Sequence, residues 1–143
     1  MKRASASKYK GKIYFVASGK TDSWLWITID PVFSVSDNED LNLLGGYVRK
    51  ILDCSKTDIP DPDPKTYKNP VIEAAGAQSW FAFAKLSQRV SFFEENGVVQ
   101  LLPSKWSGKK EGVIVLHEKT VEAPSSDISE LGKALCQAFD LCE

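Results

Sequence analysis

The spacing of apolar side chains in the first half of the chain predicts a β-hairpin followed by a helix. Lys12 to Ala17 (KIYFVA) and Trp24 to Ile29 (WLWITI) are rich in β-branched and aromatic residues, which favours two strands joined by a polar turn at 18–23. We expect Asp30-Pro31 to end the second strand. Apolar residues then recur at the spacing of one helical face, at Leu41, Leu44, Val48, Ile51 and Leu52.

The start and the middle of this predicted helix carry further signals. Its N-cap candidates are Ser36, Asp37 and Asn38, and the acids that follow suit the positive end of the helix dipole. Gly45-Gly46 lies inside the helix, where each glycine costs about 1 kcal/mol relative to alanine. The pair therefore indicates a kink, or a place where another backbone comes close.

The second half of the chain contains a clearer hairpin. Asn96-Gly97 favours a type I′ turn, which needs positive φ at both central residues, and strands are expected at 89–95 and 98–102. After a loop (SKWSGKKEG), a further strand is expected at 112–118. Short helices are predicted at 70–75 and 78–87, and a final amphipathic helix starts at the capping-box-like pair Asp127 and Glu130.

These elements predict a single α+β domain, with about five mostly antiparallel strands packed by three or four helices. We expect residues 1–10, which are polar, basic and without periodicity, to form a flexible tail, and residues 11–143 to form the domain. Four of the seven prolines fall in Ile59 to Pro70 (IPDPDPKTYKNP), which predicts a stiff, extended, acidic loop. Such a loop is either a binding loop or a plain connector.

Charge is distributed unevenly, although the formal net charge is only -1. The first twenty residues carry six bases and no acid, whereas residues 22–63 carry nine acids and three bases, a local charge of −6. A local field of this sign steers a basic partner toward the surface. The alternative is a solvated acidic face with no partner.

Few residues suit catalysis, so we expect no enzyme, cofactor or metal. His117, the only histidine, lies on the expected strand at 112–118, and no nucleophile is placed beside it by the sequence. The three cysteines lack CxxC spacing, which argues against zinc and against a disulfide framework. Phosphate-binding glycine motifs are absent, and the proline-rich acidic loop does not fit an EF-hand. An enzyme built on His117 remains a third hypothesis.

Neither a secretory signal nor a membrane-spanning stretch is evident, and the cysteines suit a reducing compartment, so we expect a cytoplasmic protein that does not contact a membrane. The basic start and the aromatic residues leave one alternative function, a small nucleic-acid-binding adaptor. The estimated pI of 5.9 argues against it.

From about Val71 onward, the order of features resembles the immunity proteins of bacterial contact-dependent growth inhibition (CDI) systems. The resemblance rests on Gly76-x-x-x-Trp80-x-x-Phe83, the strand RVSFFEENGVV, Leu102-Pro103, Gly112 opening a strand, and Ser129-x-Leu131-Gly132 in the last helix. It implies a cytoplasmic antitoxin without catalytic motifs. Such a protein binds the C-terminal toxin domain of a cognate delivered effector, often a nuclease, and neutralises it.

Nucleases that grip RNA or DNA tend to be basic, and an acidic surface complements such a partner in a one-to-one complex. The toxin-interface candidates follow from charge and loop position alone. Trp106 is included because an aromatic residue in a basic loop is either an interface anchor or a lid on the sheet. The candidates are Asp37, Glu39, Asp40, Asp58, Asp61, Asp63, Glu94, Glu95 and Trp106.

Overall fold

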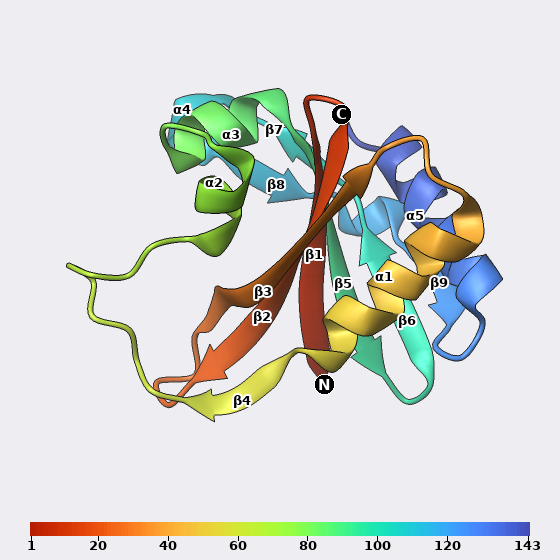
Figure 1. The fold of residues 1–143 in the computed structure, drawn as a ribbon, viewed down its shortest axis with the longest axis horizontal. Coiled ribbons are helices and arrows are strands. Elements are labelled where there is room, and N and C mark those ends of the chain that lie inside the picture. Colours follow the sequence, from red (N-terminus) through yellow and green to blue (C-terminus); the bar gives the residue numbers. More distant parts are fainter.

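A seven-stranded sheet forms the centre of the computed structural model, which describes residues 1–143 (Figure 1). The strand order is β3-β2-β1-β5-β6-β9, with neighbours antiparallel, and β4 pairs in parallel with the end of β2. A second, two-stranded sheet joins β7 and β8. The strands are β1 (Lys2–Tyr9), β2 (Lys12–Thr21), β3 (Trp26–Ser36), β4 (Lys56–Ile59), β5 (Gln88–Glu95), β6 (Val98–Leu102), β7 (Ser104–Trp106), β8 (Val113–Val115) and β9 (Val121–Pro124).

Helices cover the two faces of the large sheet unequally (Figure 1). The long helices α1 (Leu41–Asp53) and α5 (Ile128–Asp140) pack together on one face, over the main core. On the other face, α2 (Pro70–Ala75) and α3 (Trp80–Leu86) cover only the end that carries Tyr9 and Tyr14. The short helix α4 (Gly108–Glu111) connects β7 to β8. The expected α+β class is confirmed, with a larger sheet than expected.

The prediction of a flexible tail at residues 1–10 is wrong, because these residues form the central strand β1. β1 pairs with β2 on one side and with β5 on the other. Ala4 and Ala6 are at most 3% exposed and belong to the main core, while Arg3, Ser5 and Ser7 alternate onto the opposite face. Small side chains on the core side give little apolar signal in the sequence.

Proline 31 does not end its strand, contrary to expectation. β3 runs from Trp26 to Ser36, and its register against β2 shifts at Val16/Ala17, so Asp30 and Pro31 lie in a bulge. β3 is an edge strand, and a proline without an N–H is tolerated at such a position.

Two further boundaries differ from the expectation. The expected strand at 112–118 is only the short β8, which pairs with β7 inside the expected loop, and β9 takes the place beside β6. His117 consequently lies in an exposed 3₁₀ turn at His117–Lys119, not on a strand. The hairpin at Asn96-Gly97 and the Asp127 cap of the final helix are confirmed.

The glycine pair in α1 has two different roles. A Cβ on Gly45 would lie 1.9 Å from the Ile128 carbonyl oxygen of α5, whereas a Cβ on Gly46 would meet nothing within 4 Å. From the other helix, a Cβ on Gly132 would lie 2.0 Å from the Leu41 carbonyl oxygen. Glycine is therefore required where the backbones of α1 and α5 touch, which is one of the two alternatives that the sequence left open.

Candidate functional site

The turn between β2 and β3 exposes two large apolar side chains. Trp24 is 76% exposed, the highest fraction among the large hydrophobic residues, and Leu25 is 62% exposed, a fraction that only Leu86 equals. Three hydrogen bonds to Thr21 or from it close the turn: its N–H donates to the Leu25 carbonyl, its carbonyl accepts from Trp24, and its hydroxyl accepts from the Leu25 N–H. The turn is ordered, so these side chains are exposed by its geometry.

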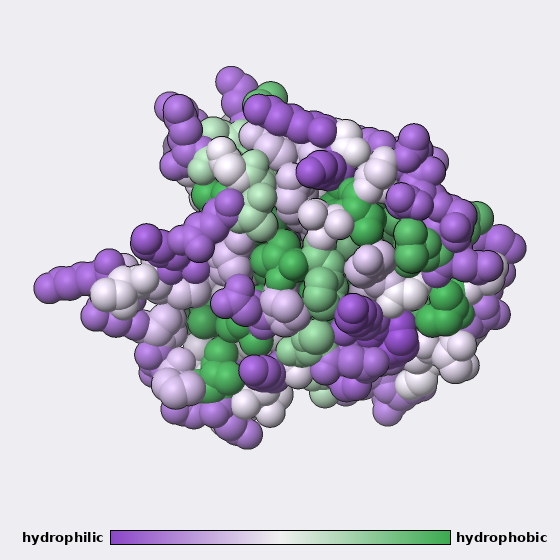
Figure 2. Space-filling view, viewed as in Figure 1, coloured by the Kyte–Doolittle hydropathy of each residue, from purple (hydrophilic) through white to green (hydrophobic).

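The acidic loop is tied to this turn at one end and to β3 at the other. The Ser23 N–H donates to Asp61 Oδ1 at 3.1 Å and the Ser23 hydroxyl donates to Oδ2. These bonds, led by the hydroxyl, lower the pKa of the Asp61 carboxyl. Farther along, the Tyr67 hydroxyl lies 2.7 Å from the Thr28 carbonyl oxygen. Between these anchors the loop projects from the body as a hydrophilic arm (Figure 2).

Two of the four non-glycine residues with positive φ lie at the turn and beside the loop, the others being Lys10 and Asn96. Trp24 has φ of 69° and Asp58 has φ of 55°, in the region that side-chain-bearing residues seldom adopt. Lys20 Nζ lies 4.1 Å from the centre of the Trp24 ring, which holds the indole in place. Asp22, Trp24 and Asp58 line one shallow cavity together with Lys20, and Asp61 is bound to the same turn through Ser23. We refer to Asp22, Trp24, Leu25, Asp58 and Asp61 as the acidic tip. The sequence does not indicate its aromatic part, because the pattern WLWITI predicts that Trp24 lies in a strand.

The remaining candidates do not join the acidic tip. Asp37, Glu39 and Asp40 lie before the N-terminus of α1, whereas β4 and then the acidic loop follow its C-terminus, and the helix between them is about 20 Å long at 1.5 Å per residue. Asp40 is also the N-cap, since its carboxylate accepts from the Leu43 N–H at 2.8 Å. Asp63 is exposed in the loop and accepts from the Lys65 N–H.

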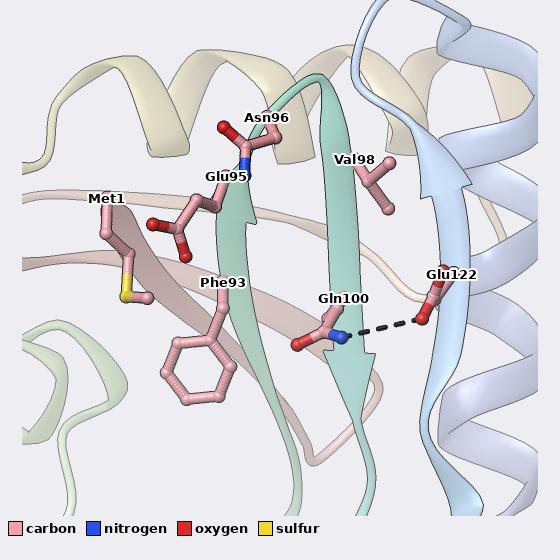
Figure 3. A pocket seen from close by; sticks show the side chains of 7 residues that line it. All are labelled: Met1, Phe93, Glu95, Asn96, Val98, Gln100 and Glu122. Atoms are coloured by element: carbon pink, nitrogen blue, oxygen red, sulfur yellow. Dashed lines mark hydrogen bonds between the residues drawn. The ribbon is translucent and has the colours of Figure 1, made fainter.

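Glu94, Glu95 and Trp106 occupy three different environments. Glu94 is held in a two-pronged ion pair by Arg49, which lowers the pKa of the carboxyl. Glu95 is exposed at the end of β5 and lines a cavity of about 260 Å³ (Figure 3). Trp106 is half-buried against Phe81, edge to face, with ring centres 5.5 Å apart. The structure thus places the nine candidates in several separate regions.

On the face of the large sheet that α2 and α3 cover only in part, the uncovered strands carry polar and aromatic side chains. In Figure 3, Phe93 and Gln100 stand on neighbouring strands, and Gln100 Nε2 donates to Glu122 on β9. On the other side of Phe93 lies a second cavity, of about 180 Å³, whose lining includes Arg3, Trp26 and Arg89. We call this second cavity the arginine pocket. The sequence does not indicate this pocket, because the polar, basic pattern of residues 1–10 predicts that Arg3 lies in a flexible tail.

Potential catalytic groups are dispersed. The exposed His117 uses its backbone carbonyl to accept from the Thr120 hydroxyl, and no nucleophile is hydrogen-bonded to its side chain. Burial raises the pKa of the thiols of Cys136 and Cys142, which reduces their nucleophilic thiolate form. Side chains able to ligate a metal do not gather in groups of three or more. None of the helices has the length and apolar character needed to cross a bilayer.

Comparisons with known proteins place the fold. No protein-family model matches the chain, and no curated protein matches it. A solved protein of unknown function from Neisseria meningitidis is similar over 99% of this chain and 95% of its own, with a TM-score of 0.77 and 17% identity. A chain of the CdiA-CT/CdiI toxin and immunity complex from Yersinia pseudotuberculosis is similar over 99% and 97%, with a TM-score of 0.75 and 14% identity.

Proposed function

We propose that this chain is a CDI immunity protein, which binds the C-terminal toxin domain of a cognate effector and neutralises it. The observation that carries the proposal is the full-length likeness in fold to a chain of a toxin and immunity complex. The order of small and apolar residues from Gly76 to Gly132 points to the same family. A one-to-one complex in the cytoplasm, without catalysis by this chain, is part of the proposal.

The acidic tip is the surface that we propose for the toxin. Its exposed tryptophan has the size and amphipathic character of an interface hot spot, and the ordered turn lowers the entropy lost on binding. The surrounding carboxylates favour a partner with a basic surface, such as a nuclease, because complementary charge speeds association. Asp58 and Asp61 of the sequence-based candidates therefore take first place, with Asp63 farther along the loop.

Co-purification with the toxin domain encoded by a neighbouring gene, followed by calorimetric titration, tests the proposal. We expect one-to-one binding with a Kd on the order of nanomolar, as for standard-size specific interfaces, and loss of the toxin's activity in the complex. A well-folded chain that neither binds nor protects against the toxin would refute the immunity function.

Single substitutions can then locate the surface without unfolding it. Trp24→Ala removes the exposed indole, and Asp58→Asn removes one charge with a residue that tolerates positive φ. The matched charge control is Glu39→Gln, which removes another exposed carboxylate, beyond the N-terminus of α1. We expect Trp24→Ala to raise Kd by about 30-fold or more, as a hot-spot truncation does. Equal affinities for all variants would place the interface elsewhere.

A further inference from the structure

Two of the three arginines in this chain have no carboxylate partner, and both line the arginine pocket. Arg49 is fully engaged by Glu94 and Asp53, whereas neither Arg3 nor Arg89 takes part in any ion pair of the structure. The only side-chain hydrogen bond from Arg3 goes to the sulfur of Met1, a weak acceptor, at 3.4 Å. The Nη groups of Arg3 therefore remain available to an incoming acceptor.

Aromatic rings fix the plane in which Arg3 can bind. Its guanidinium carbon lies 4.7 Å from the centre of the Trp26 ring and 4.6 Å from that of Phe93. Phe93 stands directly opposite Arg3 on β5, while Trp26 stands on β3, at the other side of β1. With a ring on each side, an acceptor reaches the guanidinium most readily along its own plane, which is the geometry of a bidentate carboxylate.

The rest of the pocket supports an anion. Arg89 lies four residues before Phe93 on β5, so the two side chains are on the same face of the sheet. Ser91 lies between them, and its small side chain leaves space for a ligand. Ser18 on β2 adds a hydroxyl to the lining, whereas the hydroxyl of Thr28, opposite it on β3, is hydrogen-bonded to the Tyr67 hydroxyl. Burial lowers the pKa of both Arg3 and Arg89 because no anion offsets their lost hydration. A bound anion would supply that compensation.

We propose that the arginine pocket receives an aspartate or glutamate side chain of the protein partner. This inference rests on the proposed function for the identity of the partner, and it adds that the toxin presents a carboxylate beside its basic surface. The pocket is wide enough at about 180 Å³ for a carboxylate group, and Trp26 places it two residues from Trp24 of the acidic tip. Opposite charges in neighbouring regions would fix the orientation of the partner and reject mismatched toxins.

The isolated chain allows a direct test that needs no toxin. The Nε–H signals of the three arginines are followed by nuclear magnetic resonance, during titration with N-acetyl-Gly-Glu-Gly-amide at constant ionic strength. We expect saturable shifts for Arg3 and Arg89, none for the paired Arg49, and none with the matching Gln peptide. No saturable shift with the Glu peptide overturns the assignment. If methanesulfonate, a tetrahedral monoanion, binds more tightly than the Glu peptide, the proposal of a carboxylate ligand is refuted and a free tetrahedral anion is favoured.

Binding of arginine variants to the toxin provides a second test. Arg3→Lys keeps the charge but loses the fork, and we expect it to raise the Kd for the toxin by about tenfold or more, with Arg89→Lys as an independent variant at the other end of the pocket. Unfolding curves confirm that each variant is folded. A toxin that binds both variants as tightly as the parent refutes this inference and leaves the immunity function standing, whereas a toxin that does not bind the parent refutes the function.

Discussion

Alanine at two adjacent glycines of α1 should change stability in opposite directions. Gly45 and Gly46 lie in the same helix, and replacing either by alanine improves the helix propensity by about 1 kcal/mol. Only Gly45 faces α5, where an added Cβ would lie 1.9 Å from the Ile128 carbonyl oxygen. Ordinary contact begins at 3.4 Å, so α1 and α5 would have to part there by about 1.5 Å.

The cost of that displacement follows from the packing around it. A gap of only 0.5–1 Å already loses about a quarter to a half of each dispersion contact, and overpacking typically costs about 1–3 kcal/mol or more. Because the main core lies beneath both helices, we expect Gly45→Ala to destabilise the chain by about 2 kcal/mol net. Gly46→Ala should stabilise it by about 0.5–1 kcal/mol, since nothing opposes the new methyl group.

Urea denaturation followed by circular dichroism measures the difference. The unfolding free energies of the two variants should differ by about 3 kcal/mol, with an unchanged m-value. This difference corresponds to roughly 10 °C in Tm. Gly132→Ala, which meets the Leu41 carbonyl from the opposite helix, should behave like Gly45→Ala. Equal stability of the two adjacent variants would refute the close contact of α1 with α5.

Three further predictions test other parts of the structure. Deleting Lys2–Tyr9 removes the central strand, so we expect a chain without a cooperative unfolding transition, and a stable, cooperative product would contradict the topology. Glu94→Gln weakens the pairing with Arg49 by about 1.5–3 kcal/mol in urea denaturation. Because the folded pKa of this carboxyl is lowered, its contribution is present above its ordinary value of 4.5 and is lost as the pH falls through the folded pKa, so the parent should lose more stability on acidification than the variant. Asp40→Ala removes the α1 cap and should cost about 1 kcal/mol, whereas Asp37→Ala should cost nothing measurable by the same assay.

Local chemistry made part of this fold predictable from the sequence. The turn at Asn96-Gly97 and the cap at Asp127 are specified by neighbouring residues, so the sequence predicts them correctly. β1 depends on distant partners, and its core-facing residues, such as Ala4 and Ala6, are too small to give a hydrophobic pattern. Only the alternation of polar and small residues in RASASKY could have indicated a strand.

The same limit applies to the candidate site. The acidic loop is visible in the sequence because its prolines and charges lie within twelve residues. Its hydrogen bond to Ser23, and hence its place beside Trp24, depends on the approach of β4 to the end of β2, which no local pattern encodes. The arginine pocket is less visible still, because its lining comes from β1, β2, β3 and β5.

The pairing of β1 with β5 also affects how the chain is made. The partners Lys8 and Gln88 are 80 residues apart, and Lys2 and Glu94 are 92 apart. At about 5–20 residues per second, the ribosome takes roughly 4–18 s to supply the missing neighbour. Throughout that interval one edge of β1 stays without its strand, so a newly synthesised chain is open to misassociation. Demand on chaperones should therefore be concentrated in the period before β5 emerges.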